Sequence, residues 1–435
     1  MKFYIETYGC QMNVADSEIV ASVLTKSGYE QTNNVNEANI ILVNTCSIRE
    51  NAETRVRGRL KVFHQLKKQK PDIKIGVLGC MAERLKEELL KQEVMVDMVV
   101  GPDSYREFPT ILEKLNKTDK IVETELSKEE TYEDIIPFRY ENNGISAFVS
   151  ITRGCQNFCS YCIVPYVRGV ERSRSPESIL NEIENLIKNN YKEVTLIGQN
   201  VDSYKFKYIS FPKLLKQCAQ TFPGVRFRFS TNHPKDMNDE LLQVVASYSN
   251  ICKHIHLPVQ SGSNKILKLM NRGYTREEYL KKIEAIHRYI PEAAISTDIM
   301  VGFCDETLED HLQTLSLMRE VEYDFAFMFK YSERSGTYAA KYLKDNVPEK
   351  EKIKRLNEVI SLQNELSFKS KSKDLGKIYE VLVEGYSKKS KNQYMGRNSQ
   401  NKVVVFSSNT EITFGSIVKV KIENFTSATL IGKTI

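Results

Sequence analysis

The sequence predicts an α/β protein of three domains: an N-terminal α/β domain with a parallel sheet, a partial (β/α)6 barrel related to the TIM barrel, and a small C-terminal antiparallel β-barrel. Three observations lead to this prediction. The chain has 435 residues, enough for about three domains of ~150 residues. Strand and helix patterns alternate in two series, over residues 1–118 and 141–371. Short β-like runs separated by turn residues fill residues 374–435.

The composition excludes several classes of protein. Apolar residues make up 41% of the chain and charged residues 27%, which argues against a disordered or collagen-like chain. No apolar run approaches the ~18 residues of a membrane-spanning helix, and MKFYIETYGC at the N-terminus lacks a signal-peptide core. We therefore expect a soluble cytoplasmic protein without a membrane partner. The net charge of +6 permits a nucleic-acid partner without requiring one.

The first series predicts a βαβαβ unit. Strands are expected at 2–8, 38–44 and 73–78, and helices at 16–27 and 50–69. The run ANIILVN at 38–44 is continuously apolar, as in a strand buried on both faces. Helices between successive strands indicate a parallel sheet with right-handed crossovers.

A cysteine follows each of these three strands: Cys10, Cys46 and Cys80. Parallel strands end at the same edge of a sheet, which is where open α/β sheets bind ligands. The three thiols are therefore expected to form one cluster. Because there are three thiols and not four, a metal bound by them would keep one open coordination position. The alternative is three ordinary buried cysteines, since cysteine is among the most buried residue types.

The second series follows an acidic, irregular linker at 126–143. Ser175-Pro176 and Thr275-Arg-Glu-Glu278 are helix start signals, the second as a capping box. A charged helix is expected from Pro348 to about residue 373. In such barrels the chemistry lies at the carboxyl ends of the strands. The expected strands are 146–151, 193–197, 226–230, 254–259, 294–301 and 325–331.

The C-terminal domain is expected to contain four β-like runs. These are 378–385, 402–406, 417–423 and 428–431. Turn residues separate them, and about 60 residues suffice for a small independent barrel. Residues 388–397 are interpreted as a basic connection between two of the runs.

The most specific motif is Cys155-x-x-x-Cys159-x-x-Cys162, directly after the first barrel strand. Three thiolates on one short loop suit a thiophilic metal cluster with an open position for substrate. The alternative is a zinc knuckle with a distant fourth ligand. An odd number of cysteines, nine, is a poor disulfide framework. The remaining three, Cys218, Cys252 and Cys304, lack such spacing and are interpreted as structural.

The three-cysteine loop resembles the signature of radical S-adenosylmethionine enzymes, and the chain is similar to their methylthiotransferase family. The resemblance implies a radical S-adenosylmethionine barrel in the middle domain and a TRAM-like RNA-binding barrel at the C-terminus. One departure is Cys304-Asp305, where the family commonly has Pro-Gly. The segments that carry the resemblance are YGCQMNVADSE (8–18), NTCSIRENAETRVRGRL (44–60), GVLGCMAER (76–84), ITRGCQNFCSYCIVPYVRG (151–169), GQNVDSY (198–204), HPKDM (233–237), HLPVQSGS (256–263) and MNRGYTREEYL (270–280).

This resemblance implies two 4Fe-4S clusters and two molecules of S-adenosylmethionine. The loop at 155–162 would hold the cluster whose electron cleaves S-adenosylmethionine to a 5′-deoxyadenosyl radical. Cys10, Cys46 and Cys80 would hold the second cluster, which supplies the sulfur. Residues 8–13 and 49–60 look like the branch that acts on N6-isopentenyl (dimethylallyl) adenosine at position 37 of tRNA. The implied product is 2-methylthio-N6-isopentenyladenosine, and the N-terminal sheet edge should dock over the barrel mouth.

The resemblance also suggests binding residues, for which the alternatives are polar caps on strand ends and solvated charged faces. Arg49, Arg57 and Lys61 add charge to the basic helix at 50–69, and an aromatic residue among cations suits base stacking. The expected cofactor contacts are Tyr161, Gln199, Asn200, Gln260, Asp298 and Gly302. The expected RNA contacts are Arg55, Arg59, Lys388, Lys389, Lys391, Tyr394 and Arg397.

The expected partners are a tRNA anticodon stem-loop that carries the isopentenylated adenosine and an electron donor such as flavodoxin or ferredoxin. The chain is expected to be a monomer. Two alternatives within the family are a methylthiotransferase for threonylcarbamoyl-adenosine tRNA and one for a ribosomal protein. An alternative of another class is a non-catalytic iron–sulfur RNA-binding protein, which would form no deoxyadenosine from S-adenosylmethionine.

Overall fold

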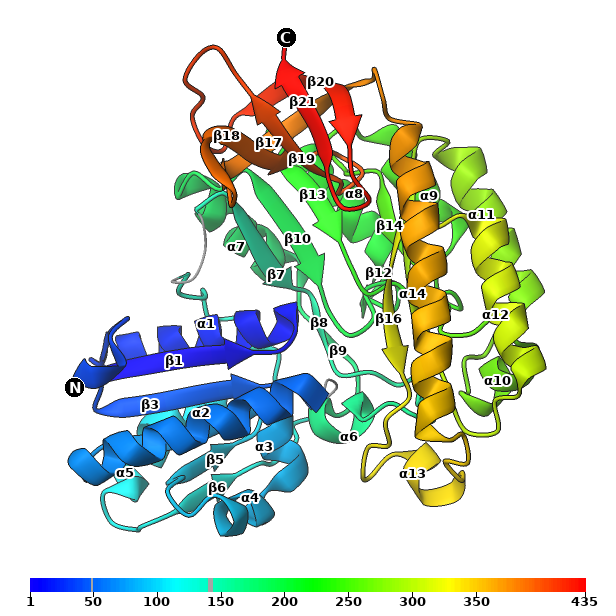
Figure 1. Cartoon of the computed structure of the whole chain (residues 1–435). Helices are drawn as coiled ribbons and strands as arrows, with labels where there is room; N and C mark the ends of the chain where they lie inside the picture. The colour runs from blue at the N-terminus through cyan, green and yellow to red at the C-terminus, as the bar shows by residue number, and fades with distance from the viewer. Residues whose placement is uncertain (48–49, 140–143) are drawn as a thin grey trace.

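The structure is a computed structural model that describes residues 1–47, 50–139 and 144–435. The first domain, blue to cyan in Figure 1, is a parallel sheet with the order β2-β1-β3-β4-β5-β6. Its strands are β1 (Lys2–Tyr8), β2 (Glu30–Gln31), β3 (Ile40–Thr45), β4 (Lys74–Gly79), β5 (Met98–Val100) and β6 (Ile121–Glu123). Its helices are α1 (Gln11–Lys26), α2 (Glu50–Gln69), α3 (Cys80–Leu85), α4 (Glu87–Gln92) and α5 (Phe108–Leu115).

The three strands predicted for this domain are β1, β3 and β4, and they are direct neighbours in the sheet. β2, β5 and β6 were not predicted, because two or three residues are too few to show a period. The sheet continues to Glu123 in β6, beyond residue 118. The helix expected from residue 16 begins at Gln11, directly after Cys10.

Residues 126–139 are irregular, as expected, but they are not a free linker. Tyr132 and Ile135 are buried in the core of the first domain. The Tyr132 hydroxyl donates a hydrogen bond to the Pro102 carbonyl (3.0 Å) and accepts one from the Tyr105 amide (3.0 Å). Tyr132 and Ile135 have acidic neighbours in the sequence, so the sequence pattern predicts a solvent-exposed segment and does not indicate that these two side chains are buried.

The middle domain is the expected partial barrel, with parallel strands in the sheets β7-β10-β13 and β14-β15-β16. A single parallel bridge between Phe227 and Ile251 connects the two sheets. The side chains of Ser175 and Thr275 cap their helices as predicted. The barrel strands are β7 (Ser146–Ser150), β10 (Glu193–Ile197), β13 (Arg226–Phe229), β14 (His254–His256), β15 (Ala294–Val301) and β16 (Phe325–Lys330).

Helices cover the outer face of the barrel strands (Figure 1) and enclose the largest hydrophobic core of the protein. These helices are α7 (Pro176–Lys188), α8 (Phe211–Thr221), α9 (Asp239–Ser247), α10 (Asn264–Leu269), α11 (Arg276–Tyr289), α12 (Leu308–Val321) and α14 (Glu349–Ser372). The shorter elements are α6 (Val164–Arg168), α13 (Tyr338–Tyr342), β8 (Thr152–Arg153), β9 (Arg172–Ser173), β11 (Lys205–Phe206) and β12 (Ile209–Ser210).

The C-terminal domain is a closed barrel with the strand order β17-β18-β19-β21-β20. Neighbouring strands are antiparallel except β19 and β21, which pair in parallel. The connection expected at 388–397 is largely the strand β18, so the sequence analysis was wrong there: its polar, glycine-containing sequence lacks an apolar run. The strands are β17 (Ile378–Ser387), β18 (Ser390–Arg397), β19 (Val403–Ser407), β20 (Ile417–Phe425) and β21 (Leu430–Thr434).

This small barrel is fixed to the amino ends of the middle-domain strands. Arg228 of β13 donates to the carbonyl oxygens of Asn398 (2.7 Å) and Ser399 (3.2 Å). Lys402 forms ion pairs with Asp324 (3.0 Å) and Asp374 (2.7 Å). The third domain is therefore held at the end of the barrel opposite its mouth (Figure 1). Among the described residues, no helix is both long enough and apolar enough to cross a membrane.

Candidate metal centres

Cys10, Cys46 and Cys80 lie at one edge of the N-terminal sheet, as predicted. β1, β3 and β4 end in register, with Tyr8 opposite Thr45 and Thr45 opposite Gly79. Each cysteine follows its strand within two residues. Three cysteines that lie far apart in the sequence therefore come together at one edge of the sheet.

Buried amide side chains support this edge. Asn13 of α1 donates from Nδ2 to Asn44 Oδ1 (3.0 Å), and Asn44 Nδ2 donates to Ser17 Oγ (2.9 Å). Asn13 Oδ1 also accepts from the Cys10 amide (3.3 Å) and lies 3.2 Å from Cys10 Sγ. These polar residues join the strand ends to α1, and the sequence analysis did not single them out.

The thiols of this edge interact with one another and with a buried cation. A hydrogen bond from Cys46 and the positive charge of Arg168 lower the pKa of Cys10 to about 6, whereas burial raises the pKa of Cys80. Arg168 donates from Nε to Cys80 Sγ at 3.2 Å. A nearby cation favours the thiolate form, which is the form that binds metal.

The second cysteine group lies on the loop between β8 and α6. The Cys162 amide donates to the Cys159 carbonyl (2.9 Å), and the Cys155 amide donates to the Gly169 carbonyl (3.2 Å). Arg272 donates from Nη1 to Cys159 Sγ (3.3 Å). Burial raises the pKa of Cys155 to about 11 and that of Cys162 to about 12.

The two cysteine groups meet. Ile163, the residue after Cys162, packs with Val167 against Cys80 in one buried cluster. On the other side of the edge, Met12 and Ala15 of α1 form a buried cluster with Ile197, the last residue of β10, and Cys10 packs against this cluster. The N-terminal sheet edge therefore lies over the barrel mouth, as expected.

A buried ion-pair network holds this arrangement. Asp16 of α1 accepts from Arg153 Nη1 (2.8 Å) and from Arg168 Nη2 (2.7 Å). Arg172 pairs with Asp103 of the first domain (2.7 Å). All five side chains are at least nine-tenths buried, so the contact between the domains excludes water from these charges.

The donor sets fit iron–sulfur clusters. All nine cysteines are free, and each group of three has one buried arginine that donates to a cysteine sulfur, which offsets the negative charge of thiolates. In the described ranges, no three His, Cys, Asp or Glu side chains are grouped as a single metal ion requires. In a cubane cluster each thiolate binds a different iron, so cluster ligands surround the group and do not converge on one point.

Three expected cofactor contacts lie around the loop at 155–162. Tyr161 packs edge-on against Phe303 (ring centroids 6.3 Å apart), and its hydroxyl accepts from Arg272 (3.3 Å). Gln199 Oε1 accepts from the Gly154 amide (2.5 Å). Asn200 donates from Nδ2 to Asp236 (2.6 Å), and its buried Oδ1 has no protein partner among the described residues. That oxygen is available to a ligand.

Of the other three, Gln260 follows β14, Asp298 lies within β15, and Gly302 directly follows β15. Gln260, with φ +71°, makes backbone hydrogen bonds to Asp298 and Met300 (both 2.8 Å). The Asp298 carboxylate lies 3.5 Å from His256 Nε2 inside the barrel. Gly302, with φ +70°, turns toward α14, and a Cβ there would collide with the Lys352 side chain. The structure therefore gives Gly302 a packing reason of its own.

An aromatic face inside the barrel was missed by the sequence analysis. Ala326 and Met328 of β16 pack against the outer core, so Phe325 and Phe327 point the other way. Phe325 stacks on His254 and Phe327 lies edge-on to His256. Phe327 is 47% exposed, which is unusual for phenylalanine on a barrel strand. The alternation in FAFMFK was the signal.

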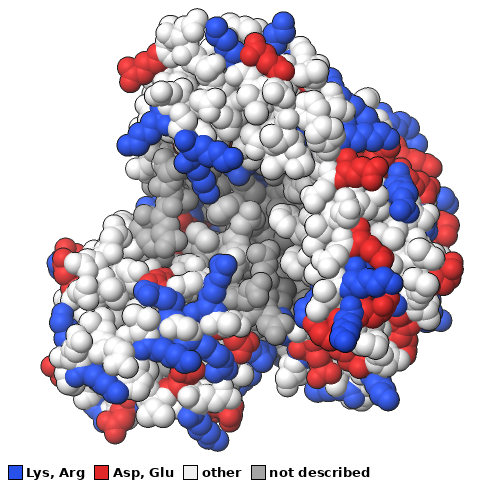
Figure 2. All heavy atoms as spheres, viewed as in Figure 1, with Lys and Arg blue, Asp and Glu red and all other residues white. Residues whose placement is uncertain are grey.

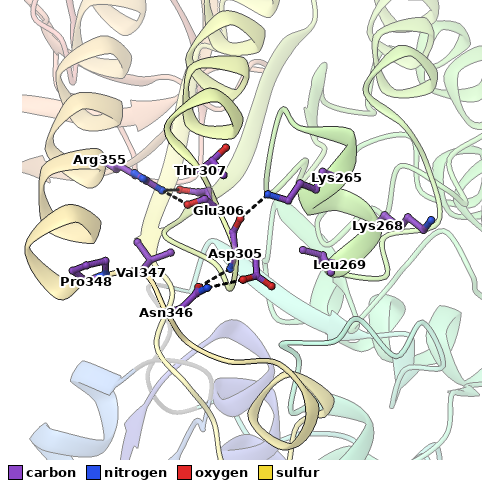
Figure 3. A pocket seen from close by; sticks show the side chains of 10 residues that line it. All are labelled: Lys265, Lys268, Leu269, Asp305, Glu306, Thr307, Asn346, Val347, Pro348 and Arg355. Carbon is purple, nitrogen blue, oxygen red and sulfur yellow. Dashed lines mark hydrogen bonds and ion pairs between the residues drawn. The ribbon is translucent and has the colours of Figure 1, made fainter.

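A pocket of about 840 Å³ opens beside the loop that follows β15 (Figure 3). None of the expected cofactor contacts or cysteine ligands lines it. Asp305, which stands where the family commonly has glycine, has φ +59° and bonds Asn346 twice, at 2.9 and 2.6 Å (Figure 3). Aspartate tolerates this left-handed conformation better than most residues, so the turn forms without Pro-Gly.

The basic helix α2 is partly neutralised. Arg59 pairs with Glu6 and lies over the Phe63 ring (4.8 Å), and Arg57 pairs with Glu53 (3.2 Å). Arg55 is exposed, while Arg49 lies outside the described residues. On the face in Figure 2, lysine and arginine side chains of the first and third domains rim a hollow between the domains.

The C-terminal barrel corrects one expected RNA contact. Tyr394 is only 8% exposed, and its hydroxyl accepts from the Ile412 amide (3.1 Å), so it belongs to the barrel core. Its neighbours Tyr386 and Phe414 are 45% and 44% exposed and present the available aromatic faces. Arg397 pairs with Glu384 (2.7 Å). The three expected lysines, Lys388, Lys389 and Lys391, are exposed at the β17–β18 turn.

Comparison with known proteins matches all three domains. Residues 2–101 match the Uncharacterized protein family UPF0004, residues 149–318 the Radical SAM superfamily, and residues 373–435 the TRAM domain. Two relatives are named tRNA-2-methylthio-N(6)-dimethylallyladenosine synthase. The one from Bacteroides thetaiotaomicron is 56% identical to this chain, and the match covers 100% of this chain and 96% of the relative. The one from Parabacteroides distasonis is also 56% identical, and the match covers 100% of this chain and 95% of the relative.

Two solved structures are similar in fold. The radical S-adenosylmethionine methyltransferase TsrM from Kitasatospora setae has a TM-score of 0.57 at 11% identity, over 75% of this chain and 72% of that chain. The cobalamin-dependent S-adenosylmethionine radical enzyme OxsB has a TM-score of 0.52 at 14% identity, over 83% and 56%. At these identities the likeness shows the fold alone.

Proposed function

The chain belongs to the family of tRNA-2-methylthio-N(6)-dimethylallyladenosine synthases, and we propose that it catalyses the reaction which that name describes. The reaction replaces the hydrogen on C2 of an N6-dimethylallyl (isopentenyl) adenosine in tRNA with a methylthio group. We place the target at position 37 of the anticodon stem-loop. Full-length similarity at about 55% identity supports the assignment.

One observation carries the proposal: the segment that follows Cys162 packs against Cys80, so the two cysteine groups lie at the same interface between the first and middle domains. Ile163, just before α6, lies in one buried cluster with Cys80, and Arg168, the last residue of α6, donates to Cys80 Sγ. Cys10 packs against a cluster that includes Ile197 at the end of β10. The group that activates C2 and the group that supplies sulfur must reach the same carbon atom, so their ligand sets must be adjacent. Two remote sites could not perform this reaction.

The cofactors are two 4Fe-4S clusters and S-adenosylmethionine, and we assign one cluster to each cysteine group. When bound, they supply the electron that cleaves S-adenosylmethionine, the radical that activates C2, and the transferred sulfur. The chain's own residues orient and enclose these reactants. Arg272 holds Cys159 and the Tyr161 hydroxyl, which fixes the loop beside the predicted cofactor site. The buried ion pairs of Asp16 hold the first domain against the loop that carries the second cysteine group, and exclusion of water there would limit side reactions.

The barrel interior supports a nucleobase as the substrate. Phe327 offers an exposed ring beside His256 and Asp298, so a flipped base would meet an aromatic face and polar groups together. The hollow in Figure 2 has basic side chains on its rim, as binding to RNA phosphates requires. We infer that the stem-loop enters through this hollow and that its dimethylallyl group contacts Phe327.

Finer parts of the proposal concern the partners. We infer that a flavodoxin or ferredoxin supplies the electrons, because the cofactors need a low-potential donor. Nine free thiols suit the reducing cytoplasm, and we place the enzyme there as a monomer. The exposed lysines of the β17–β18 turn and the faces of Tyr386 and Phe414 are the proposed RNA contacts of the third domain.

The proposal is tested by anaerobic reconstitution of the wild type, Cys155→Ala and Cys80→Ala, followed by iron counting and two product assays. Each variant should lose roughly half of the iron, since two clusters are expected. Cys155→Ala should form no deoxyadenosine. Cys80→Ala should still form deoxyadenosine but transfer no methylthio group to an isopentenylated stem-loop.

The choice of RNA separates the alternatives. Methylthiolation of a threonylcarbamoyl-adenosine stem-loop in place of the isopentenylated one would assign the chain to the sister activity. Iron loading without deoxyadenosine formation by the wild type would indicate a binding protein. A wild type that holds only one cluster would overturn the mechanism.

A further inference from the structure

Arg168 connects the two cysteine groups through a single buried side chain. It lies in α6, six residues after Cys162, and is 3% exposed. Nε donates to Cys80 Sγ at 3.2 Å, and Nη2 donates to Asp16 at 2.7 Å. Nη1 is buried and has no partner among the described residues. The Arg168 guanidinium therefore donates a hydrogen bond to a thiol of the first domain and has one nitrogen, Nη1, that donates to no described residue.

The position of this guanidinium is fixed from both sides of the interface. Asp16 accepts from Arg168 through one oxygen and from Arg153 Nη1 (2.8 Å) through the other. Arg153 lies two residues before Cys155. A single carboxylate on the helix that follows Cys10 thus anchors both ends of the segment that carries the other three cysteines. The charge beside Cys80 is held in place and not merely nearby.

We propose that Arg168 is a positioning residue that tunes the N-terminal cluster and raises its reduction potential. A hydrogen bond to a ligating sulfur and a fixed positive charge both stabilise the more negative, reduced cluster. Arg168 Nη1, which is buried without a partner among the described residues, would be free to donate a further hydrogen bond to such a cluster. This inference rests on the proposed function, because it requires a cluster on Cys10, Cys46 and Cys80.

Arg172 provides a matched control within the same interface. It is a buried arginine that pairs across the domains with Asp103 (2.7 Å) and donates from Nη2 to the Arg168 carbonyl (2.8 Å). No hydrogen bond joins it to a cysteine among the described residues. Loss of Arg172 therefore weakens the contact between the domains but leaves the cation at Cys80.

The experiment uses a full-length parent in which Cys155, Cys159 and Cys162 are alanine, so that only the N-terminal cluster remains. Arg168→Met, Arg168→Lys and Arg172→Met are added to it separately. Each reconstituted protein is titrated with dithionite, which gives one electron to the cluster, and the reduced cluster is followed by electron paramagnetic resonance. We expect a shift to lower midpoint potential in Arg168→Met, a smaller shift in Arg168→Lys, and none in Arg172→Met.

The outcomes separate this inference from the function on which it rests. A parent without iron would overturn the assignment of the N-terminal cluster, and the inference with it. A loaded parent whose midpoint is unchanged in Arg168→Met, or shifts equally in Arg172→Met, would overturn the inference alone. If Arg168→Met loses its iron, Arg168→Lys decides: a midpoint below that of the parent would support the inference, and an unchanged midpoint would overturn it.

Discussion

Replacement of Gly9 by alanine should disrupt the N-terminal cysteine group specifically. Gly9 lies between β1 and Cys10 with φ +144°. A Cβ at this position would lie 2.6 Å from Cys46 Cβ and 2.7 Å from Asn13 Oδ1. Neither is the free end of a flexible side chain, since Asn13 is held in the buried network of the strand ends. The added methyl group therefore pushes two ligand-bearing segments apart.

The cost has two parts. Overpacking of a tightly packed site costs about 1–3 kcal/mol, and an L-residue forced into a left-handed conformation adds about 1–2 kcal/mol. Gly28→Ala isolates the second part, because Gly28 has φ +85° but nothing within 4 Å of its Cβ position. The difference between the two variants measures the collision at the cysteines.

The assay is chemical denaturation of both apoproteins, followed by anaerobic reconstitution and iron counting. Gly9→Ala should lose roughly half of the iron and still cleave S-adenosylmethionine. Gly28→Ala should keep all of its iron. Full iron content and wild-type stability in Gly9→Ala would refute the close approach of Gly9 to Cys46 and Asn13.

Four further predictions follow from particular contacts. Asp16→Asn leaves two buried arginines without a carboxylate and should cost about 3–5 kcal/mol in urea denaturation; a loss below about 1 kcal/mol would contradict the interdomain network. Burial raises the pKa of Glu83 from 4.5 to about 7, so its contribution to stability is full below pH 4.5 and is lost as the pH rises to about 7. Thermal unfolding at pH 5 and pH 8 should therefore differ less for Glu83→Gln than for the wild type; an unchanged difference would disprove the buried carboxyl. Phe327→Ala should lower the preference for isopentenylated over unmodified stem-loop, measured as the ratio of kcat/KM values, about tenfold. Phe368 on α14 is also exposed (53%), and Phe368→Ala should leave this preference unchanged. Charge reversal of Lys388, Lys389 and Lys391 should weaken stem-loop binding about tenfold at physiological salt, while both clusters are retained. An unchanged affinity would show that this surface does not bind the RNA.

The sequence predicted the elements that are long and periodic. β1, β10 and β15 begin and end as expected or nearly so, because a buried parallel strand has a continuous apolar pattern. It failed for β18, whose strand is polar and contains glycine, and for the anchors Tyr132 and Ile135. Their burial depends on residues more than twenty positions away, which a local pattern does not register.

For the candidate site, the six cysteines could be selected because their spacing and their position after strands are local properties. The residues that contact those cysteines could not be selected from the sequence. Arg168 and Arg272 are separated from the sulfurs they contact by 88 and 113 residues. Tyr394 was selected for its cationic neighbours, but it packs into the barrel core, whereas its cross-strand partner Tyr386 stays 45% exposed.

By itself the sequence determined which residues are the candidates for the chemistry, since ligand type, short-range spacing and strand periodicity are encoded within a few residues of one another. Only the tertiary structure decided that the segments carrying the two groups of thiols pack against one another. Asp16 reaches Arg153 and Arg168 across 137 and 152 residues. The physical reason is that buried charges require partners, and the partners available to these arginines lie on another domain.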